Sequence, residues 1–277
     1  MRTTPRAVVI AVGLVAGGTL LKGAETPGGA LTLSDAQHEF YNARYDAAAA
    51  QTLELRTSDP EDLAAHELRA SALLFQLKNA LGASRDKQKD LKVCAPCSQW
   101  MKAFLEDTAS GQTLARRRLA ADPQNESALF FLGKLDLNYV WLQLGTLGRK
   151  TGWDEYWEAR RSLDAVLKAN PTHVRGRIAR AWIDYIVDTR MPKGTRWVLG
   201  GGSRKRALIA VREAANTESD FYIRAEAEFS LWDMQVRERN FSEAVQIAQK
   251  LLRDFPDNRD LVAFLASETA SGSRNEN

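Results

Sequence analysis

Apolar residues recur along most of the chain at spacings of three and four, which is the period of a helix with one buried face. The segment that contains Ala244, Ile247, Ala248, Leu251 and Leu252 shows this pattern, with polar and charged residues at the positions between. No alternation of apolar and polar residues that would predict a strand is evident. The pattern therefore predicts an all-α fold of amphipathic helices.

Four prolines divide the helical pattern at equivalent points, namely Pro60, Pro123, Pro171 and Pro256. Each follows one amphipathic segment and precedes another, because a proline ring disfavours helical backbone at the residue before it. A small residue stands twelve positions before each proline: Ala48, Gly111, Ala159 and Ala244. Another stands ten positions after it: Ala70, Gly133, Ala181 and Ala266. Small residues at fixed offsets indicate points where neighbouring helices approach closely.

An aromatic residue lies three positions before the first small residue in three of the four copies, at Tyr45, Tyr156 and Phe241. These offsets resemble the tetratricopeptide repeat (TPR), over about residues 34–270. The Trp, Leu and Tyr expected in the first helix of each repeat are mostly absent. The resemblance implies an all-α, right-handed TPR-like solenoid of about five helix pairs, with 258–270 as a C-terminal capping helix. Such scaffolds usually hold a peptide or partner protein at the concave face and its loops, and less often a small ligand.

The distances between the prolines predict three long loops. Successive gaps are 63, 48 and 85 residues, against a repeat of about 34 residues, and the third gap would span two repeats. The excess falls in 79–97, 145–152 and 188–203, each between the first and second helix of a pair. Turns of one kind emerge on one edge of a helical solenoid, so we expect the loops to cluster there. Long loops are often functional, but tolerated insertions are the alternative, because loop length costs little entropy.

Residues 1–24 have the order of a secretory signal, with Arg2 and Arg6 followed by the uncharged, mostly apolar run Ala7–Leu21. Fifteen residues span about 22 Å as a helix, less than the roughly 30 Å hydrocarbon layer. We therefore expect a periplasmic or secreted protein; an uncleaved anchor in the inner membrane is the alternative. Residues 25–33 are expected to form a linker and 271–277 a disordered tail.

The N-terminal segment accounts for the apparent basicity of the chain. Residues 1–24 hold three of the 38 Lys and Arg and none of the 35 Asp and Glu. The remaining residues carry equal numbers of cationic and anionic side chains, so the net charge gives no support to nucleic-acid binding. The hydrophobic content of 44% and charged content of 26% are those of an ordinary folded protein.

The first expected loop contains the only two cysteines of the chain, Cys94 and Cys97. In an oxidising compartment this pair predicts a local disulfide that staples the loop. A redox-active pair is a second hypothesis, because the N-terminus of the following helix would lower the pKa of the first thiol. A metal site is a third, less favoured reading: zinc would need two more ligands, and the three histidines show no paired spacing.

The third expected loop is the main candidate for binding, because 189–206 holds six Lys and Arg and no acidic residue. Two tryptophans border the second and third loops beside cationic residues. An aromatic wall next to guanidinium groups would suit a ligand with an apolar body and an acidic group. The candidate binding residues are Arg190, Arg196, Trp197, Arg204 and Trp153. The alternative is a flexible connection with a solvated basic face.

Motifs for catalysis are absent from the sequence: there is no Gly-x-Ser-x-Gly elbow, no His-Glu-x-x-His and no dinucleotide-binding glycine set. We therefore expect no enzymatic activity and no cofactor. The sequence favours an exported scaffold for protein–protein interaction in the bacterial cell envelope, touching the membrane only through residues 1–24 if these remain attached. The alternative is a periplasmic component of a solute transport system that binds a small anionic ligand at 188–206.

Overall fold

A computed structural model describes residues 30–82 and 86–275. Helices make up most of these residues and no strand occurs among them, so the expected all-α fold is confirmed. The chain divides into Met1–Ala30 and a unit Leu31–Asn277, and the second unit contains every described helix. The expected signal or anchor at 1–24 and most of the expected linker at 25–33 lie outside the described residues. The first helix begins at Leu33.

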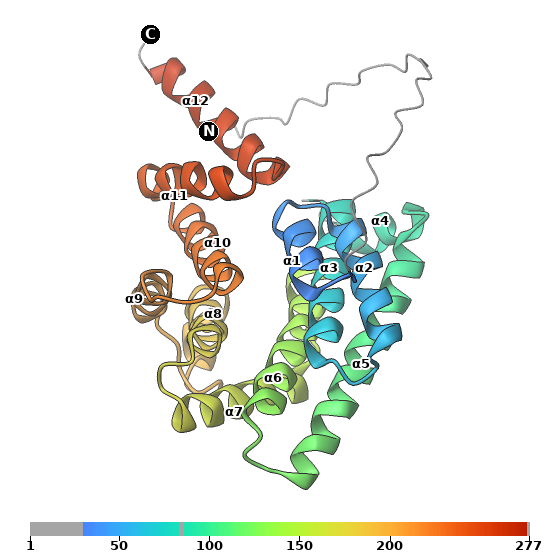
Figure 1. Cartoon of the computed structure of the whole chain (residues 1–277). Coiled ribbons are helices and arrows are strands. Elements are labelled where there is room, and N and C mark those ends of the chain that lie inside the picture. Colours follow the sequence, from blue (N-terminus) through green and yellow to red (C-terminus); the bar gives the residue numbers. More distant parts are fainter. Residues whose placement is uncertain (1–29, 83–85, 276–277) are drawn as a thin grey trace, which may run out of the picture. The chain divides into compact units, whose positions relative to one another are not determined.

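Five helix pairs follow one another along the described chain, each with a first and a second helix (Figure 1). The first helices are α1 (Leu33–Tyr41), α3 (Leu63–Leu81), α6 (Glu126–Val140), α8 (Val174–Arg190) and α10 (Phe221–Arg237). Their partners, in the same order, are α2 (Tyr45–Ser58), α5 (Cys97–Ala121), α7 (Trp153–Ala169), α9 (Arg204–Ala215) and α11 (Phe241–Asp254). A last helix, α12 (Arg259–Asn275), packs on α11. These are the five pairs and C-terminal helix of the predicted TPR-like fold.

The proline turns are built alike because a polar residue follows each proline by two positions and another precedes three of the four prolines. The side chain before the proline accepts from the amide two positions on at Asp59, Asp122 and Asn170, over 3.0 to 3.2 Å. The side chain two positions after the proline caps the next helix by accepting from amides of its first turn. These caps are Asp62, Asn125, His173 and Asn258. The recurring hydrogen bonds explain why these turns stay tight.

The small residues of the repeat lie where helices meet. A Cβ added at Gly111 would stand 2.6 Å from Leu135 Cδ1, and one at Gly133 would stand 2.8 Å from Leu163 Cγ. Neither position therefore has room for a larger side chain unless a leucine of the neighbouring helix shifts. Ala266 is exposed instead, because no described helix follows α12 to cover it.

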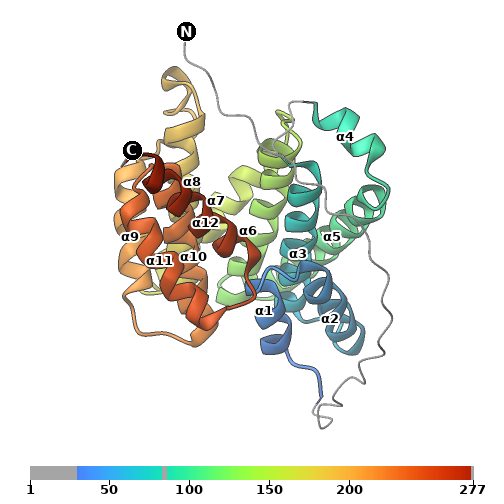
Figure 2. The ribbon, with the colours of Figure 1, turned by 90° about the horizontal axis from the view of Figure 1, so that it is seen from above.

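The three long connections emerge on one edge, which we call the loop edge. The first connection holds α4 (Lys87–Val93), the second continues from the π-helical turn η1 (Trp141–Thr146) through 152, and the third is 191–203 with the short helix η2 (Lys193–Thr195). The side-chain amide of Gln88 lies 3.1 Å from the guanidinium of Arg149, which places the first connection beside the second. Leu144 and Leu199 line one cavity, which joins the second to the third. Figure 2 shows α4 and the connection after α8 projecting from the same edge, as the repeat pattern predicted.

The helix α12 runs five residues beyond the expected end at 270. Residues 271–275 of the expected tail are thus drawn as helix, while 276–277 lie outside the described residues. Gly272 weakens the helix by only about 1 kcal/mol relative to alanine, and no proline is present to stop it.

Candidate functional site

The first helices of the pairs meet on an inner face, where four charged side chains form a network. Lys134 of α6 lies 2.7 Å from Glu226 of α10 and 3.7 Å from Glu67 of α3. Arg175 of α8 lies 2.6 Å from Glu226 and 3.5 Å from Glu67. Two cations and two carboxylates thus alternate and join four helices. We call these four residues the inner charge cluster.

The inner charge cluster is largely withdrawn from solvent, with exposed side-chain fractions of 5% for Glu67, 12% for Glu226 and 20% for Arg175. Burial alone would raise the pKa of Glu226, but Arg175 and then Lys134 outweigh burial and lower that pKa to about 2. Burial alone would lower the pKa of Lys134, but Glu226 and Glu67 outweigh it and raise that pKa. Glu226 and Lys134 are therefore both charged at neutral pH.

Two features occupy the inner face: the inner charge cluster and a set of contacts between the first and last helix pairs. Tyr41 of α1 stacks on Phe229 of α10 with ring centroids 5.3 Å apart, and Arg44 lies 2.5 Å from Asp257 beyond α11. A peptide running along this face would have to separate the pairs and leave buried charges without partners, which is costly. The contacts therefore disfavour the inner face as the place where a partner binds.

The two tryptophans predicted to border a ligand lie in different surroundings. Trp153 is 39% exposed and lines an apolar cavity of about 40 Å³ between α6, α8 and the third connection. Trp197 is 77% exposed and does not line that cavity. Sites for drug-sized ligands are several times larger, about 300–1,000 Å³. The structure therefore does not bring the two tryptophans together around a cavity of ligand size.

The three candidate arginines also differ from one another. Arg196 forms an ion pair with Asp188, and Arg204 lies 3.3 Å from Glu238 at the end of α10. Arg190 is exposed and has no side-chain partner among the described residues. Of the three, only Arg190 is thus free to bind an anion without giving up an existing ion pair.

The third connection is exposed but firmly braced. The hydroxyl of Tyr156 and the guanidinium of Arg160 both donate to the carbonyl of Leu199, at 2.7 and 3.1 Å. The backbone at Gly202 passes so close to α8 that an added Cβ would stand 2.5 Å from a backbone oxygen of that helix. The tip that carries Trp197 is therefore presented on a defined support.

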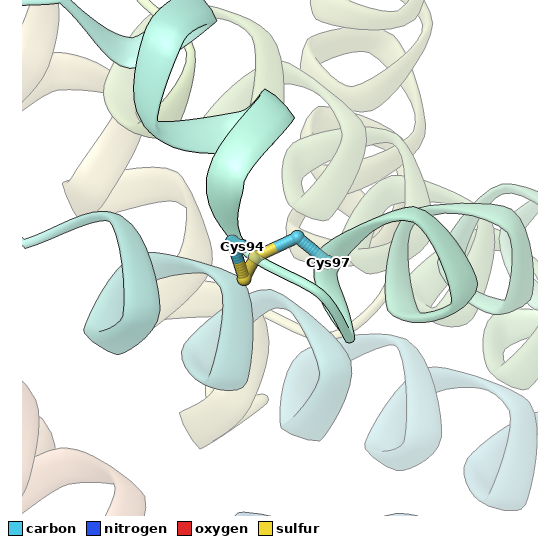
Figure 3. Close-up of a disulfide and its surroundings, with 2 residues drawn as sticks. All are labelled: Cys94 and Cys97. Atoms are coloured by element: carbon cyan, nitrogen blue, oxygen red, sulfur yellow. A yellow bond between two sulfur atoms is a disulfide. The ribbon is translucent and has the colours of Figure 1, made fainter.

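Figure 3 shows Cys94 and Cys97 joined by a disulfide where α4 meets α5, with their Cα atoms 5.4 Å apart. Cys97 is the first residue of α5 and is fully buried, whereas Cys94 is half-buried. The amide of Cys97 also donates to the carbonyl of Cys94 at 3.2 Å. The bridge therefore fixes a single turn at the loop edge.

Replacing both Cys94 and Cys97 with alanine should lower the free energy of unfolding by about 2 kcal/mol, because a very short closed loop restricts the unfolded chain only modestly. Urea unfolding followed by circular dichroism measures the change. Reduction of the unmodified protein with dithiothreitol is the control and should give a similar loss. A loss above about 4 kcal/mol would show that the bridge holds more than this turn.

A recess of about 520 Å³, which we call the outer groove, lies between α7, α8 and α9. Its apolar lining consists of Leu167, Pro171, Ala181, Ala207 and Ala210. Its polar lining consists of Arg177, Arg180, Asp184 and Arg206. The groove thus combines a floor of apolar side chains, most of them alanines, with a rim rich in guanidinium groups.

Ion pairs fix two of the three arginines of the outer groove. Arg177 pairs with Glu213 of α9, and Arg180 lies 2.6 Å from Asp184 of its own helix. Arg206 is exposed and has no side-chain partner among the described residues. Arg177 and Arg180 cannot be recognised as site residues from the sequence, since their spacing on α8 is also that of an ordinary solvated face. Only the packing of three helices shows that they border a recess.

The described residues contain neither a candidate metal site nor a helix that could span a membrane. No group of three His, Cys, Asp or Glu side chains is arranged to hold a metal ion there. Within the same part of the chain, no helix is both long and apolar enough to cross a membrane.

No protein-family model matches the sequence, and no curated protein matches it. Among solved structures, the chain is similar to the crystal structure of a thermophilic TPR protein of Thermus thermophilus, at 17% identity and a TM-score of 0.47. That alignment covers 85% of this chain and 95% of the other. The TPR-like assignment rests on the paired helices and recurring turns described above.

Proposed function

We propose that this protein is a scaffold that binds a partner protein through the outer groove. The observation that supports this proposal is an open recess with an apolar floor and an arginine rim. Apolar side chains of a partner would fill the floor, and a carboxylate would pair with the free guanidinium of Arg206. The occupied inner face supports this choice, because it leaves the outer surface and edges of the helix stack for binding.

We propose further that the scaffold works in the bacterial cell envelope. The charged, apolar and small residues of 1–24 follow the order of an export signal. The disulfide between Cys94 and Cys97 supports the same proposal, since such bonds persist in oxidising compartments and are rare in the cytosol.

Substitution of Ala210 by tryptophan should strongly weaken partner binding, because the indole would fill the outer groove that Ala210 lines. The full chain, tagged and incubated with envelope extract, is compared with A210W for the partner that each retains. We expect at least a tenfold loss, on the order of the effect of one blocked interface anchor.

The matched control is Ile209→Trp, since Ile209 is the preceding residue of α9, is 45% exposed and does not line the groove. This control should retain the partner, and both variants should keep the helical circular dichroism of the parent. Arg206→Glu, which reverses the charge of the rim arginine that has no side-chain partner among the described residues, should weaken the same interaction. Retention of the partner by folded A210W and R206E chains would contradict the proposal.

A further inference from the structure

The most exposed large apolar side chains of the described residues lie on the loop edge. Trp197 is 77% exposed, Val93 75% and Val198 52%, whereas no other large apolar side chain in the described part of the chain exceeds 48%. Val93 stands at the end of α4, and Trp197 and Val198 form the tip of the third connection. These side chains project from two separate connections and line neither the outer groove nor the apolar cavity.

Exposed cations accompany the apolar tips. Lys92 precedes Val93, Arg190 is the last residue of α8, and Lys193 lies in the connection that carries Trp197. Neither they nor Lys150 of the second connection have a side-chain partner among the described residues. The carboxylate of Asp188 is already engaged, because it pairs with Arg196 and accepts from the amide of residue 204. The loop edge therefore carries more cationic than anionic side chains around its apolar tips, with Asp86 and Asp90 of the first connection as further acidic residues.

We propose that the loop edge docks on an anionic membrane surface. Trp197 and Val93 would enter the headgroup layer, where tryptophan is favoured, and the free cations would bind lipid phosphates. A protein partner would need the apolar side chains to gather around a packed central pocket, whereas a bilayer accepts separate tips that project from one edge. The braced third connection presents Trp197 for such an insertion. This role uses residues other than those of the outer groove, so it stands independently of the proposed partner binding.

Cosedimentation with vesicles tests the docking. The full chain should bind phosphatidylcholine vesicles that contain phosphatidylglycerol more tightly than pure phosphatidylcholine vesicles, and added salt should weaken this preference. Arg190→Gln and Lys193→Gln should each reduce binding to the anionic vesicles about fivefold. Trp197→Ala should reduce it by at least about fivefold.

Two matched controls lie away from the loop edge. Val262→Ser removes an apolar side chain of α12 that is 48% exposed, and Arg117→Gln removes an exposed cation of α5. Both should bind the anionic vesicles as the parent does. Equal binding by the loop-edge variants and these controls would overturn the proposal.

Quenching by brominated phosphatidylglycerol reports directly which surface faces the lipid. All seven tryptophans of the chain lie in described residues, so the signal arises there whatever residues 1–29 do. Trp197→Phe should remove most of the quenching, and Trp232→Phe on α10 should leave it unchanged. Quenching that persists in W197F would overturn the docking. A second outcome would also overturn it: the parent shows no vesicle binding, and the loop-edge variants no longer retain a protein from envelope extract that the parent retains.

Discussion

Replacement of Arg175 by methionine should lower the free energy of unfolding by about 3 to 5 kcal/mol. Arg175 pairs with both carboxylates of the inner charge cluster, whose exposed fractions are only 5% at Glu67 and 12% at Glu226. Methionine keeps much of the side-chain volume but leaves two buried carboxylates with Lys134 as their one paired cation among the described residues. A stranded buried charge costs far more than the loss of an ion pair in water. Urea unfolding at neutral pH, followed by circular dichroism, measures this loss.

The control for this prediction is Arg117→Met, which removes an ion pair with Glu61 whose two side chains are 64% and 59% exposed. An exposed pair contributes less than about 1 kcal/mol, so this variant should unfold almost as the parent does. Similar losses in R175M and R117M would contradict a buried, coupled cluster.

The pH dependence gives a second check on R175M. The pKa of Glu226 is lowered to about 2 in the folded parent, so this group contributes stability above its ordinary pKa of 4.5 that is lost as the pH falls toward 2. Without Arg175 most of that contribution is missing. The difference in unfolding free energy between parent and R175M should therefore be largest at neutral pH and shrink on acidification. A difference that stays constant from neutral pH to pH 3 would contradict this account.

The repeat could be predicted from the sequence because its determinants are local. A proline at a fixed offset from small residues such as Ala48 and Gly111 determines both where a helix ends and where the next one packs. The loop edge followed for the same reason, since every long connection joins a first helix to a second. The length of α12 could not be predicted in this way. The Ser-, Gly- and Asn-rich end of the chain gives only a weak signal for a helix and an equally weak signal for a frayed end.

The inner charge cluster could not be predicted, because its members are ordinary charged residues on four helices far apart in sequence. Glu67 and Glu226 are separated by more than half of the chain, and nothing in their local spacing distinguishes them from solvated carboxylates. Their convergence depends on how successive helix pairs pack against one another. For the same reason, the sequence predicts one aromatic wall from Trp153 and Trp197, whereas in the structure only Trp153 of the two borders a cavity.

A second large effect should come from Asp136, a carboxyl group on α6 that is fully buried. The side chain of Gln112 donates to one oxygen at 2.6 Å, and the other oxygen has no hydrogen-bond partner among the described residues. Burial and then Glu158 raise the pKa of Asp136 to about 8, against the smaller lowering by Gln112. The folded chain therefore holds a proton on Asp136 at pH 6, whereas the unfolded chain loses it near pH 4.

Asp136→Asn should remove a fall in stability that the parent shows between about pH 4 and pH 8. Within that window the folded parent binds more protons than the unfolded chain, so its unfolding free energy decreases as the pH rises, by up to about 1.4 kcal/mol per unit. Asparagine does not titrate. The unfolding free energy of D136N, relative to that of the parent, should therefore rise from pH 5 to pH 8 and stay level above pH 8. Urea unfolding of both chains at each pH measures the gain, and Asp233→Asn at a partly exposed carboxylate of α10 is the control, expected to follow the parent. Parallel curves for D136N and the parent would show that Asp136 is ionised in the folded chain, with solvent or a movement of α5 compensating its charge.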